Sequence, residues 1–368
     1  MTDWRERVRR PRLVSLALTA GLVLAGTAAG VAVAEVAFRL FPQSKLTIDL
    51  RDLHELRPDR PWLYGMRPGT ARVAAGVRYA VNADGFRDRA YARPKPPGTF
   101  RVVVIGDSLA FGYGVPLEAS FPKLLEASLV NLLPGAEVLN LGVCGYNPFT
   151  EAALFTDVGI TYEPDLVLVE FCVNDLNDPT LHFDFPTFAR LPDIPAAAFP
   201  DPERKRAFAP PSLAERLCRA SRACAFVRDR LFPPRLDAAT IKATLVTRDD
   251  PSESELRWLR ARYEEIARAA RARGARFAVV VFPYATQLDG RAPARLNERL
   301  VDLGREAGWV TIDLLPAFRA AAVPGAPPLL FDLWHPTVAG HRVAAEALLR
   351  ALRCAGLLPL PPDAGCAP

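Results

Sequence analysis

A serine in this 368-residue sequence stands where a nucleophile would be useful. Ser108 follows an apolar, β-branched run in VVVIGDS, which predicts that a buried strand turns into a helix at this residue. There its N–H group lies at a helix N-terminus, where it can donate to an oxyanion. The triplet Gly-Asp-Ser is also typical of simple turns and helix caps. The serine alone therefore does not predict an enzyme.

The segment FDLWHPTVAGH supplies a base of the type that such a serine needs. Asp332 lies three residues before His335, so a short turn brings the carboxylate beside one imidazole nitrogen and leaves the other facing outward. The alternative is a surface histidine next to an aspartate that caps a helix. We expect that helix at 338–352, with Pro336 in its first position. His341, inside the helix, is interpreted as structural or exposed.

Two further segments place small or amide residues after strands. In NLGVCGYN (140–147) the glycines permit close approach of the backbone, so the N–H of Gly145 can point into a site. In VEFCVNDLND the amide of Asn174 follows a buried run and can donate to an oxyanion. Each segment alone is a weak signal. Serine, glycine, asparagine and histidine after successive elements are much harder to explain as turns.

Alternating strands and helices must position these residues. Short β-branched runs predict the strands, and amphipathic segments predict the helices, one of them with a capping box of Ser252 and Glu255. The order favours an α/β fold, a parallel sheet with helices on both faces, and ligands bind such sheets at the carboxyl ends of the strands. The expected strands are 100–105, 137–141, 165–171, 276–282 and 309–313, and the expected helices are 121–133, 252–273 and 338–352.

The four segments resemble the motif blocks of the SGNH, or GDSL-type, hydrolases over about residues 100–352. The resemblance implies a three-layer, flavodoxin-like fold with a five-stranded parallel sheet. It also implies that Ser108 is the nucleophile, that His335 is the base and that Asp332 orients it. The oxyanion donors would be the N–H groups of Ser108 and Gly145 and the side chain of Asn174.

One residue departs from the family pattern. Cys172 stands where the third block usually has glycine, and we interpret it as a variant that keeps function. Cys144 and Cys172 are expected to be buried structural thiols, with a disulfide or redox control as the alternative. Six cysteines suit an oxidising compartment and allow fifteen pairings, of which none is assigned. The sequence predicts no cofactor and no metal, since the cysteines and histidines lack metal-ligand spacing.

The N-terminus predicts the compartment. Residues 13–34 carry no charge and are long enough to cross a bilayer, and the arginines of the 1–12 leader favour a cytoplasmic start. We therefore expect a single-pass anchor in the inner (cytoplasmic) membrane with the catalytic domain outside the cytoplasm. A cleavable signal peptide is the alternative. No block of basic residues interleaved with aromatics occurs, so nucleic acid is not an expected partner.

The remaining segments have looser signals. Residues 43–99 are expected to form a connector with a hairpin over 72–89, whose turn is 81–86. Residues 176–250 are expected to be an insertion in the hydrolase domain at 100–352. It is either a lid, with His182 as a candidate lid residue, or a surface excursion. A tail at 353–368 ends the chain.

The activity that these residues predict is acyl transfer from an ester. We expect a serine esterase that cleaves acyl esters, above all acetyl esters, of cell-envelope or extracellular carbohydrate. Its expected partners are an acylated small molecule or polysaccharide and the membrane. The alternatives are an O-acyltransferase that uses the same site and a catalytically inactive protein that binds glycan.

Overall fold

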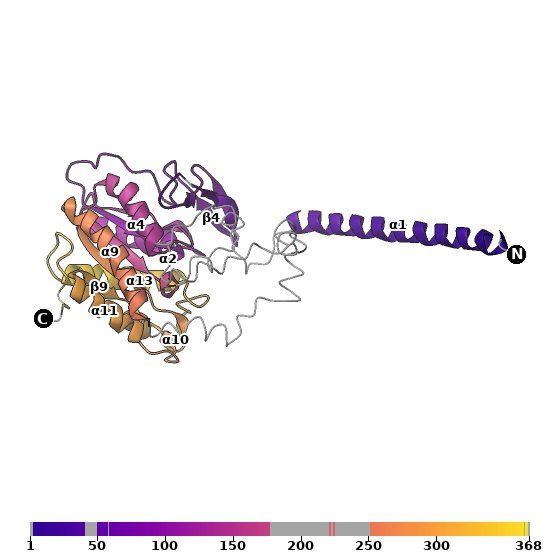
Figure 1. The fold of residues 1–368 in the computed structure, drawn as a ribbon. Coiled ribbons are helices and arrows are strands. Elements are labelled where there is room, and N and C mark those ends of the chain that lie inside the picture. The colour runs from indigo at the N-terminus through magenta and orange to yellow at the C-terminus, as the bar shows by residue number, and fades with distance from the viewer. Residues whose placement is uncertain are drawn as a thin grey trace. The chain divides into compact units, whose positions relative to one another are not determined.

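The computed structural model describes residues 3–40, 50–57, 59–176, 221, 224, 251–363 and 365–366. They belong to two units, one with helix α1 (Asp3–Leu40) and one with the sheet (Figure 1). The expected insertion at 176–250, His182 included, lies almost entirely outside the described residues.

Helix α1 has the length and composition of a membrane span. Its apolar part, Leu18–Ala37, is not buried against the rest of the protein. Leu22 and Leu24, for example, are exposed over 74% and 71% of their surfaces. Apolar side chains exposed all around a helix are unfavourable in water and favourable in a lipid bilayer. The helix is consistent with either a signal sequence or an anchor.

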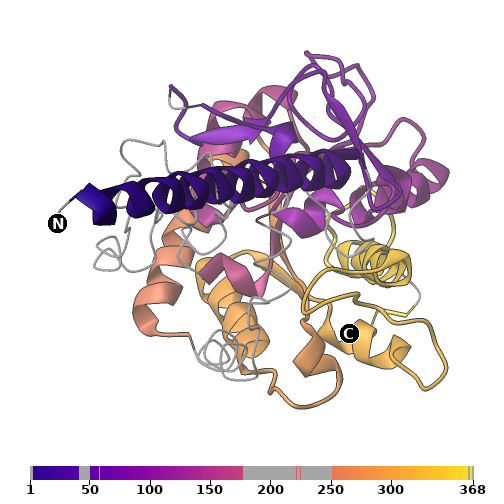
Figure 2. The ribbon, with the colours of Figure 1, turned by 90° about the vertical axis from the view of Figure 1, so that its right-hand side faces the viewer.

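The second unit is built on a five-stranded, wholly parallel sheet. Its strand order is β6-β5-β7-β8-β9, so the chain starts near one edge, steps outward once and then returns across the first strand. Helices α3 and α13 pack together on one face, and α4, α9 and α11 on the other. Figures 1 and 2 show helices on both sides of the sheet. The expected α/β fold with three layers is confirmed.

The strands form because their residues suit a sheet covered on both faces. Runs such as RVVVI and LVLVEF are buried over their whole length, as parallel strands between two helix layers must be. The strands are β5 (Arg101–Ile105), β6 (Glu137–Asn140), β7 (Leu166–Phe171), β8 (Arg276–Val281) and β9 (Val310–Asp313), each within a residue of its expected bounds.

Helices α9 and α13 show how local signals set helix ends. The expected capping box at Ser252 and Glu255 is present at the start of α9. The expectation for Pro336 is wrong: Thr337 caps α13 through its hydroxyl, so the proline lies outside the helix. The α-helices in the described part of the unit are α2 (Ser108–Phe111), α3 (Phe121–Leu132), α4 (Pro148–Asp157), α9 (Glu253–Ala272), α10 (Ala285–Leu288), α11 (Arg295–Ala307), α12 (Leu315–Ala321) and α13 (Val338–Cys354).

The hairpin before the sheet turns earlier than expected. Strands β3 (Ala71–Ala74) and β4 (Val77–Ala80) pair across Ala75 and Gly76, which both have positive φ. The segment 81–86 is instead a separate loop, in which the Asn82 side chain accepts from two backbone N–H groups. Asparagine and glycine at 82 and 85 do form a turn, but not the turn between the strands. A second small hairpin pairs β1 (His54–Leu56) with β2 (Tyr64–Met66).

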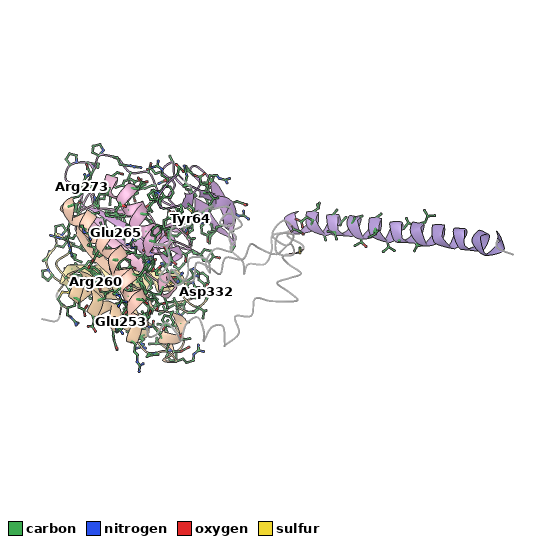
Figure 3. All side chains as sticks on the ribbon, in the orientation of Figure 1. Tyr64, Glu253, Arg260, Glu265, Arg273 and Asp332 are labelled. Atoms are coloured by element: carbon green, nitrogen blue, oxygen red, sulfur yellow. A yellow bond between two sulfur atoms is a disulfide. The ribbon has the colours of Figure 1, made fainter. Side chains whose placement is uncertain are left out.

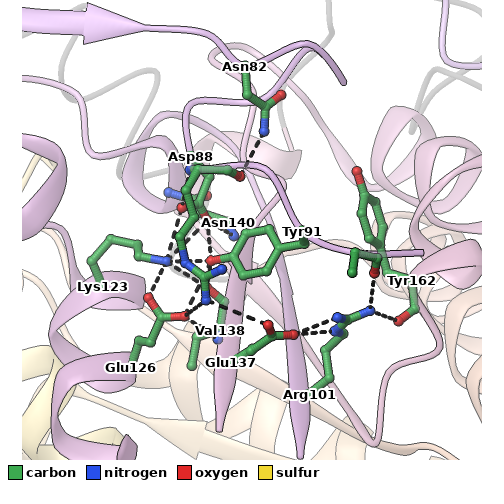
Figure 4. A network of polar contacts seen from close by, with 12 residues as sticks. Asn82, Asp88, Tyr91, Arg101, Lys123, Glu126, Glu137, Val138, Asn140 and Tyr162 are labelled. Atoms are coloured by element: carbon green, nitrogen blue, oxygen red, sulfur yellow. Dashed lines mark hydrogen bonds and ion pairs between the residues drawn. The ribbon is translucent and has the colours of Figure 1, made fainter. Parts of the chain in front are cut away.

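The segment before β5 is attached to the sheet by a polar network (Figure 4). The Asp88 carboxylate pairs with Lys123 of α3 and accepts from the backbone N–H of Asn140. The Tyr91 hydroxyl donates to the carbonyl of Val138. Buried Arg101 pairs with Glu137 of the neighbouring strand. These contacts fix the connector against β6 and α3, on the side of the sheet where the second motif block begins.

Candidate active site

The side chains of Ser108, His335 and Asp332 form one hydrogen-bonded row. The Ser108 Oγ lies 2.9 Å from the His335 Nε2, and the His335 Nδ1 lies 2.6 Å from the Asp332 Oδ2. The serine and the histidine are 227 residues apart in the chain, so only the fold brings them together. Figure 3 shows Asp332 well apart from Arg260 and Glu265, which project from α9. The imidazole is placed to take a proton from the serine while the carboxylate holds its other nitrogen.

Ser108 is the first residue of the short helix α2, directly after β5. The preceding Asp107 caps this helix, since its Oδ1 accepts from the backbone N–H of Leu109 at 2.9 Å. The backbone N–H of Asp107 donates in turn to the Glu170 Oε2 at 3.1 Å, from the neighbouring strand β7. Asp107 and Glu170 are each about 1% exposed. The turn that presents the serine is therefore fixed from both sides by buried carboxyl groups.

Asn174 is joined to the same turn. Its Nδ2 donates to the Asp107 Oδ2 at 2.8 Å, which orients the plane of the amide. The next residue, Asp175, closes a tight turn: its Oδ2 accepts from the N–H of Cys172, and its own N–H donates to the Cys172 carbonyl. This explains why asparagine and aspartate occur together after β7, since one carries the amide and the other shapes the turn beneath it.

The second motif block packs directly on α2. The Asn140 Nδ2 donates to the carbonyl of Ala110, and the Asn140 Oδ1 accepts from the N–H of Gly142. A Cβ on Gly142 would lie 2.5 Å from the backbone nitrogen of Phe111, so only glycine permits this approach. Gly145 follows with a φ of 81°, in the left-handed region. The block therefore lies beside the helix that begins at Ser108, as the sequence predicts.

The loop with Asp332 and His335 is held mainly by local bonds. The Asp332 Oδ1 accepts from the backbone N–H groups of Trp334 and His335, and the N–H of Phe331 donates to the carbonyl of His335. Burial favours the neutral form of Asp332, but the hydrogen bond and charge of His335 and the two N–H groups outweigh it, so its pKa is lowered. The carboxylate is thus kept ionised beside the imidazole.

Three further carboxyl groups lie buried around the turn that presents Ser108. Burial raises the pKa values of Glu170, Glu151 and Asp175, and mutual repulsion within the group, which includes Asp107, raises them further. Like charges in a dry interior cannot all ionise, so burial and mutual repulsion favour the neutral form of these three acids. Sequence reasoning missed Glu170, although a glutamate inside LVLVEF is a visible exception in an apolar run.

Arg87 is a second residue that sequence reasoning missed. Its buried guanidinium donates to the carbonyl of Phe111, the last residue of α2, and to the carbonyls of Gly112 and Val115 in the loop that follows. It also lies over the ring of Tyr79, 4.3 Å from the centroid. Burial lowers the pKa of Arg87. The connector therefore holds the end of α2, while the neighbouring strand holds its start.

The remaining expected residues have structural surroundings. Cys144 and Cys172 are free, buried thiols, and burial raises the pKa of both, as does the charge of Asp107. His341 is fully buried; its Nδ1 accepts from the N–H of Phe121, and burial, with the charges of His335 and Arg87, lowers its pKa to about 3. Cys354 and Cys366 form a disulfide, for which the sequence assigned no pairing.

Comparison with known proteins identifies the class. Residues 104–343 match the model of the GDSL-like lipase/acylhydrolase family. This range includes all four motif blocks. The chain belongs to this family of carboxylic ester hydrolases. The resemblance seen in the motifs is confirmed, and so is the prediction of an enzyme that acts on ester bonds.

Particular relatives are more distant. The chain is 35% identical to an arylesterase of Vibrio mimicus over 75 residues, which are 20% of this chain and 38% of that protein. Among solved structures, TesA is similar with a TM-score of 0.41 and 15% identity, over 70% of this chain and 99% of TesA. An acetylxylan esterase of Geobacillus stearothermophilus is similar with a TM-score of 0.42 and 16% identity, over 70% and 96% of the two chains.

Proposed function

We propose that the chain is a serine esterase that removes acetyl groups from carbohydrate outside the cytoplasm, with Ser108, His335 and Asp332 as its catalytic residues. The observation that carries the proposal is the row from Ser108 Oγ to His335 Nε2 to Asp332, with separations of 2.9 and 2.6 Å. A nucleophile, a base within hydrogen-bond reach and a group that orients the base are the parts that acyl transfer requires.

In the first step the serine oxygen attacks the ester carbonyl while His335 Nε2 takes the hydroxyl proton. The tetrahedral oxyanion is held by the N–H groups of Ser108 and Gly145 and by the amide of Asn174. When the intermediate collapses, the C–O bond to the alcohol breaks, and His335 gives its proton to the departing alkoxide. The products are the free alcohol and an acyl-serine.

In the second step water, deprotonated by His335, attacks the acyl-serine. The C–O bond to Ser108 breaks, the serine recovers its proton from the imidazolium, and a carboxylic acid leaves. Throughout, Asp332 keeps the proton of the neutral imidazole on Nδ1 and stabilises the imidazolium. The lowered pKa of Asp332 supports this role, because the carboxylate must stay charged beside the cation.

Helix α1 supports the proposed location. Its apolar part, Leu18–Ala37, supports a single membrane anchor with the catalytic unit on the extracytoplasmic side. Ester-bearing polymers of the envelope or the medium would then be the accessible substrates. The acetyl group and the carbohydrate are our proposal, whereas the hydrolase class is given by the family.

The test uses the full chain in detergent micelles. We expect acetate release from p-nitrophenyl acetate and from acetylated xylan, and a loss of about 10⁴-fold or more in kcat for Ser108→Ala. Ser128→Ala is the matched control, because the hydroxyl of this serine on α3 donates within its own helix, to the carbonyl of Leu124. Equal rates for the two variants would contradict the proposal and favour a glycan-binding protein.

An added unacetylated xylooligosaccharide separates hydrolysis from transfer. Release of free acetate alone supports the esterase. Acetyl groups that appear on the added glycan, and that depend on Ser108, would instead identify an O-acyltransferase with the same acyl-serine.

A further inference from the structure

Two aromatic rings lie beside the imidazole of His335. The ring centroid of Tyr113 is 4.6 Å from that of His335, and the ring of Phe331 is 5.5 Å away and nearly parallel to it. Tyr113 and Phe331 are 6.3 Å from each other. This separation is much shorter than it would be if the imidazole lay between them. The three rings therefore form a triangle rather than a stack.

The rings come from the two segments that meet at the serine–histidine bond. Tyr113 follows α2, and its N–H donates to the carbonyl of Ser108. Phe331 belongs to the loop of the base, where its N–H donates to the carbonyl of His335. A backbone bridge between Leu330 and Pro336 closes that loop. The positions of both rings are thus fixed by the same bonds that fix the reacting groups.

Phe331 is the most exposed of the phenylalanines that the structure describes in this unit. It is 45% exposed, whereas Phe111, Phe121 and Phe155 are fully buried. A single exposed apolar side chain needs no explanation by itself. Here the exposed ring lies next to the imidazole and beside the ring of Tyr113, so its surface is available to a substrate bound at Ser108.

The chemistry decides which part of a substrate meets these rings. His335 Nε2 must come within hydrogen-bond reach of the departing alkoxide oxygen to protonate it. Whatever group is attached to that oxygen therefore lies beside the imidazole. The rings next to the imidazole line the alcohol side of the ester, whereas the acyl carbon is held at Ser108.

We propose that Phe331 and Tyr113 form a subsite for the sugar ring that carries the ester, with the apolar face of a pyranose lying on the aromatic surface. The inference rests on the proposed function, since it assigns the alcohol side of that reaction. Among the residues that the structure describes, the half-exposed Phe331 gives this side of the site an aromatic wall. A pyranose suits one wall because its hydroxyl groups stay hydrated, whereas an alkyl chain needs enclosure to leave water.

The experiment compares three acetate esters with the full chain: an acetylated methyl xylopyranoside, phenyl acetate and ethyl acetate. For Phe331→Leu, which removes the aromatic face and keeps apolar bulk, we expect kcat/KM to fall about tenfold more on the xyloside than on ethyl acetate. Phe331→Tyr keeps the face and should restore the ratio. Leu132→Ala is the control, since this side chain is equally exposed at 45% on α3.

The pattern of losses decides the outcome. Equal losses on the three esters would overturn the subsite and give Phe331 a merely structural role in the loop. A loss confined to phenyl acetate would also overturn it, in favour of an aryl alcohol. Binding of unacetylated methyl xylopyranoside to the full chain gives a readout without chemistry. If no ester is hydrolysed but this binding is weaker in Phe331→Leu, the subsite stands and the proposed esterase fails. Binding that is the same in Phe331→Leu and the unmodified chain overturns the subsite.

Discussion

Two segments of this site are built in opposite ways: the turn that presents Ser108, called here the nucleophile turn, and the loop that carries Asp332 and His335, called here the base loop. Ser108 is 8% exposed, and the adjacent Asp107 is bonded to Leu109, Asn174 and Glu170, which lie on three different elements. Asp332 has a side chain 42% exposed, and its partners all lie within three residues of it. One half of the site is part of the core, and the other is a local loop at the surface.

This difference separates stability from chemistry. We expect a substitution in the base loop to remove a group of the proposed catalytic row without opening the core. A substitution around the nucleophile turn is expected to disturb folding and activity together. A rigid nucleophile also suits the oxyanion donors, whose geometry must be set before the reaction. The five predictions below test this separation, from the largest expected effect to the smallest.

Asp332→Asn should break the base loop chemically and leave the fold intact. The amide oxygen can still accept from the N–H groups of Trp334 and His335, but its NH₂ group faces Nδ1 and forces the proton of the imidazole onto Nε2. We expect kcat to fall about 10³–10⁴-fold with little change in melting temperature. Asp302→Asn, which removes another exposed i,i+3 ion pair, is the control. A melting temperature lowered along with kcat would contradict the separation.

Glu170→Ala should lower both the stability of the fold and the activity of the nucleophile turn. It removes the acceptor of the Asp107 N–H and leaves a cavity, so we expect the free energy of unfolding to fall by about 2–4 kcal/mol, with a loss of kcat. Glu170→Gln keeps an acceptor and should retain most activity. The measurements are chemical denaturation and kcat on p-nitrophenyl acetate. Full activity and stability in Glu170→Ala would show that the turn does not need this bond.

Glu170→Gln and the unmodified chain should also differ in the pH dependence of their stability. Because burial raises the pKa of Glu170 in the folded state, the stability due to its neutral form is complete below the unfolded pKa of about 4.3 and declines as the pH rises above it. Glu170→Gln cannot ionise, so its stability should decline less than that of the unmodified chain between about pH 5 and 8. Parallel stability curves would contradict a neutral Glu170.

His341→Gln tests the buried histidine of α13, which bonds to the backbone of Phe121, whereas His335 bonds to Ser108. The folded pKa of His341 is lowered to about 3, below the unfolded value of about 6.5, so the unfolded chain binds its proton more readily. Stability should therefore fall as the pH drops from about 6.5 toward 3. In His341→Gln this acid limb should be shallower, as followed by melting temperature against pH. An unchanged limb would assign the acid sensitivity to other groups.

Cys172→Gly, which restores the usual family residue, should have the smallest effect. The thiol is buried and its backbone N–H is bonded to Asp175, so we expect kcat to stay within about threefold and stability to fall by about 1 kcal/mol. Native protein should resist thiol reagents at Cys144 and Cys172, since burial raises both pKa values. A large gain in kcat would show that the thiol obstructs the site.

The sequence by itself determined the sheet and the residues of the motif blocks. Continuous β-branched runs suit a strand that is covered on both faces. All five strands accordingly lie within a residue of their expected bounds. Ser108, Asp332 and His335 were readable because their chemistry restricts the residue types that follow a strand or precede a helix. Helix caps such as Ser252 were readable because they depend only on neighbours in the chain.

Only the tertiary structure decided what surrounds these residues. Arg87 behind α2, Glu170 beneath Asp107, and Tyr113 beside Phe331 are pairs brought together by sheet order and loop closure. The turn at Ala75 and Gly76 was likewise missed, because the loop at Asn82 has the stronger local turn signal. Periodicity and caps record contacts within a few residues. Contacts between distant segments depend on packing the whole chain, and those contacts orient the serine, the base and the rings.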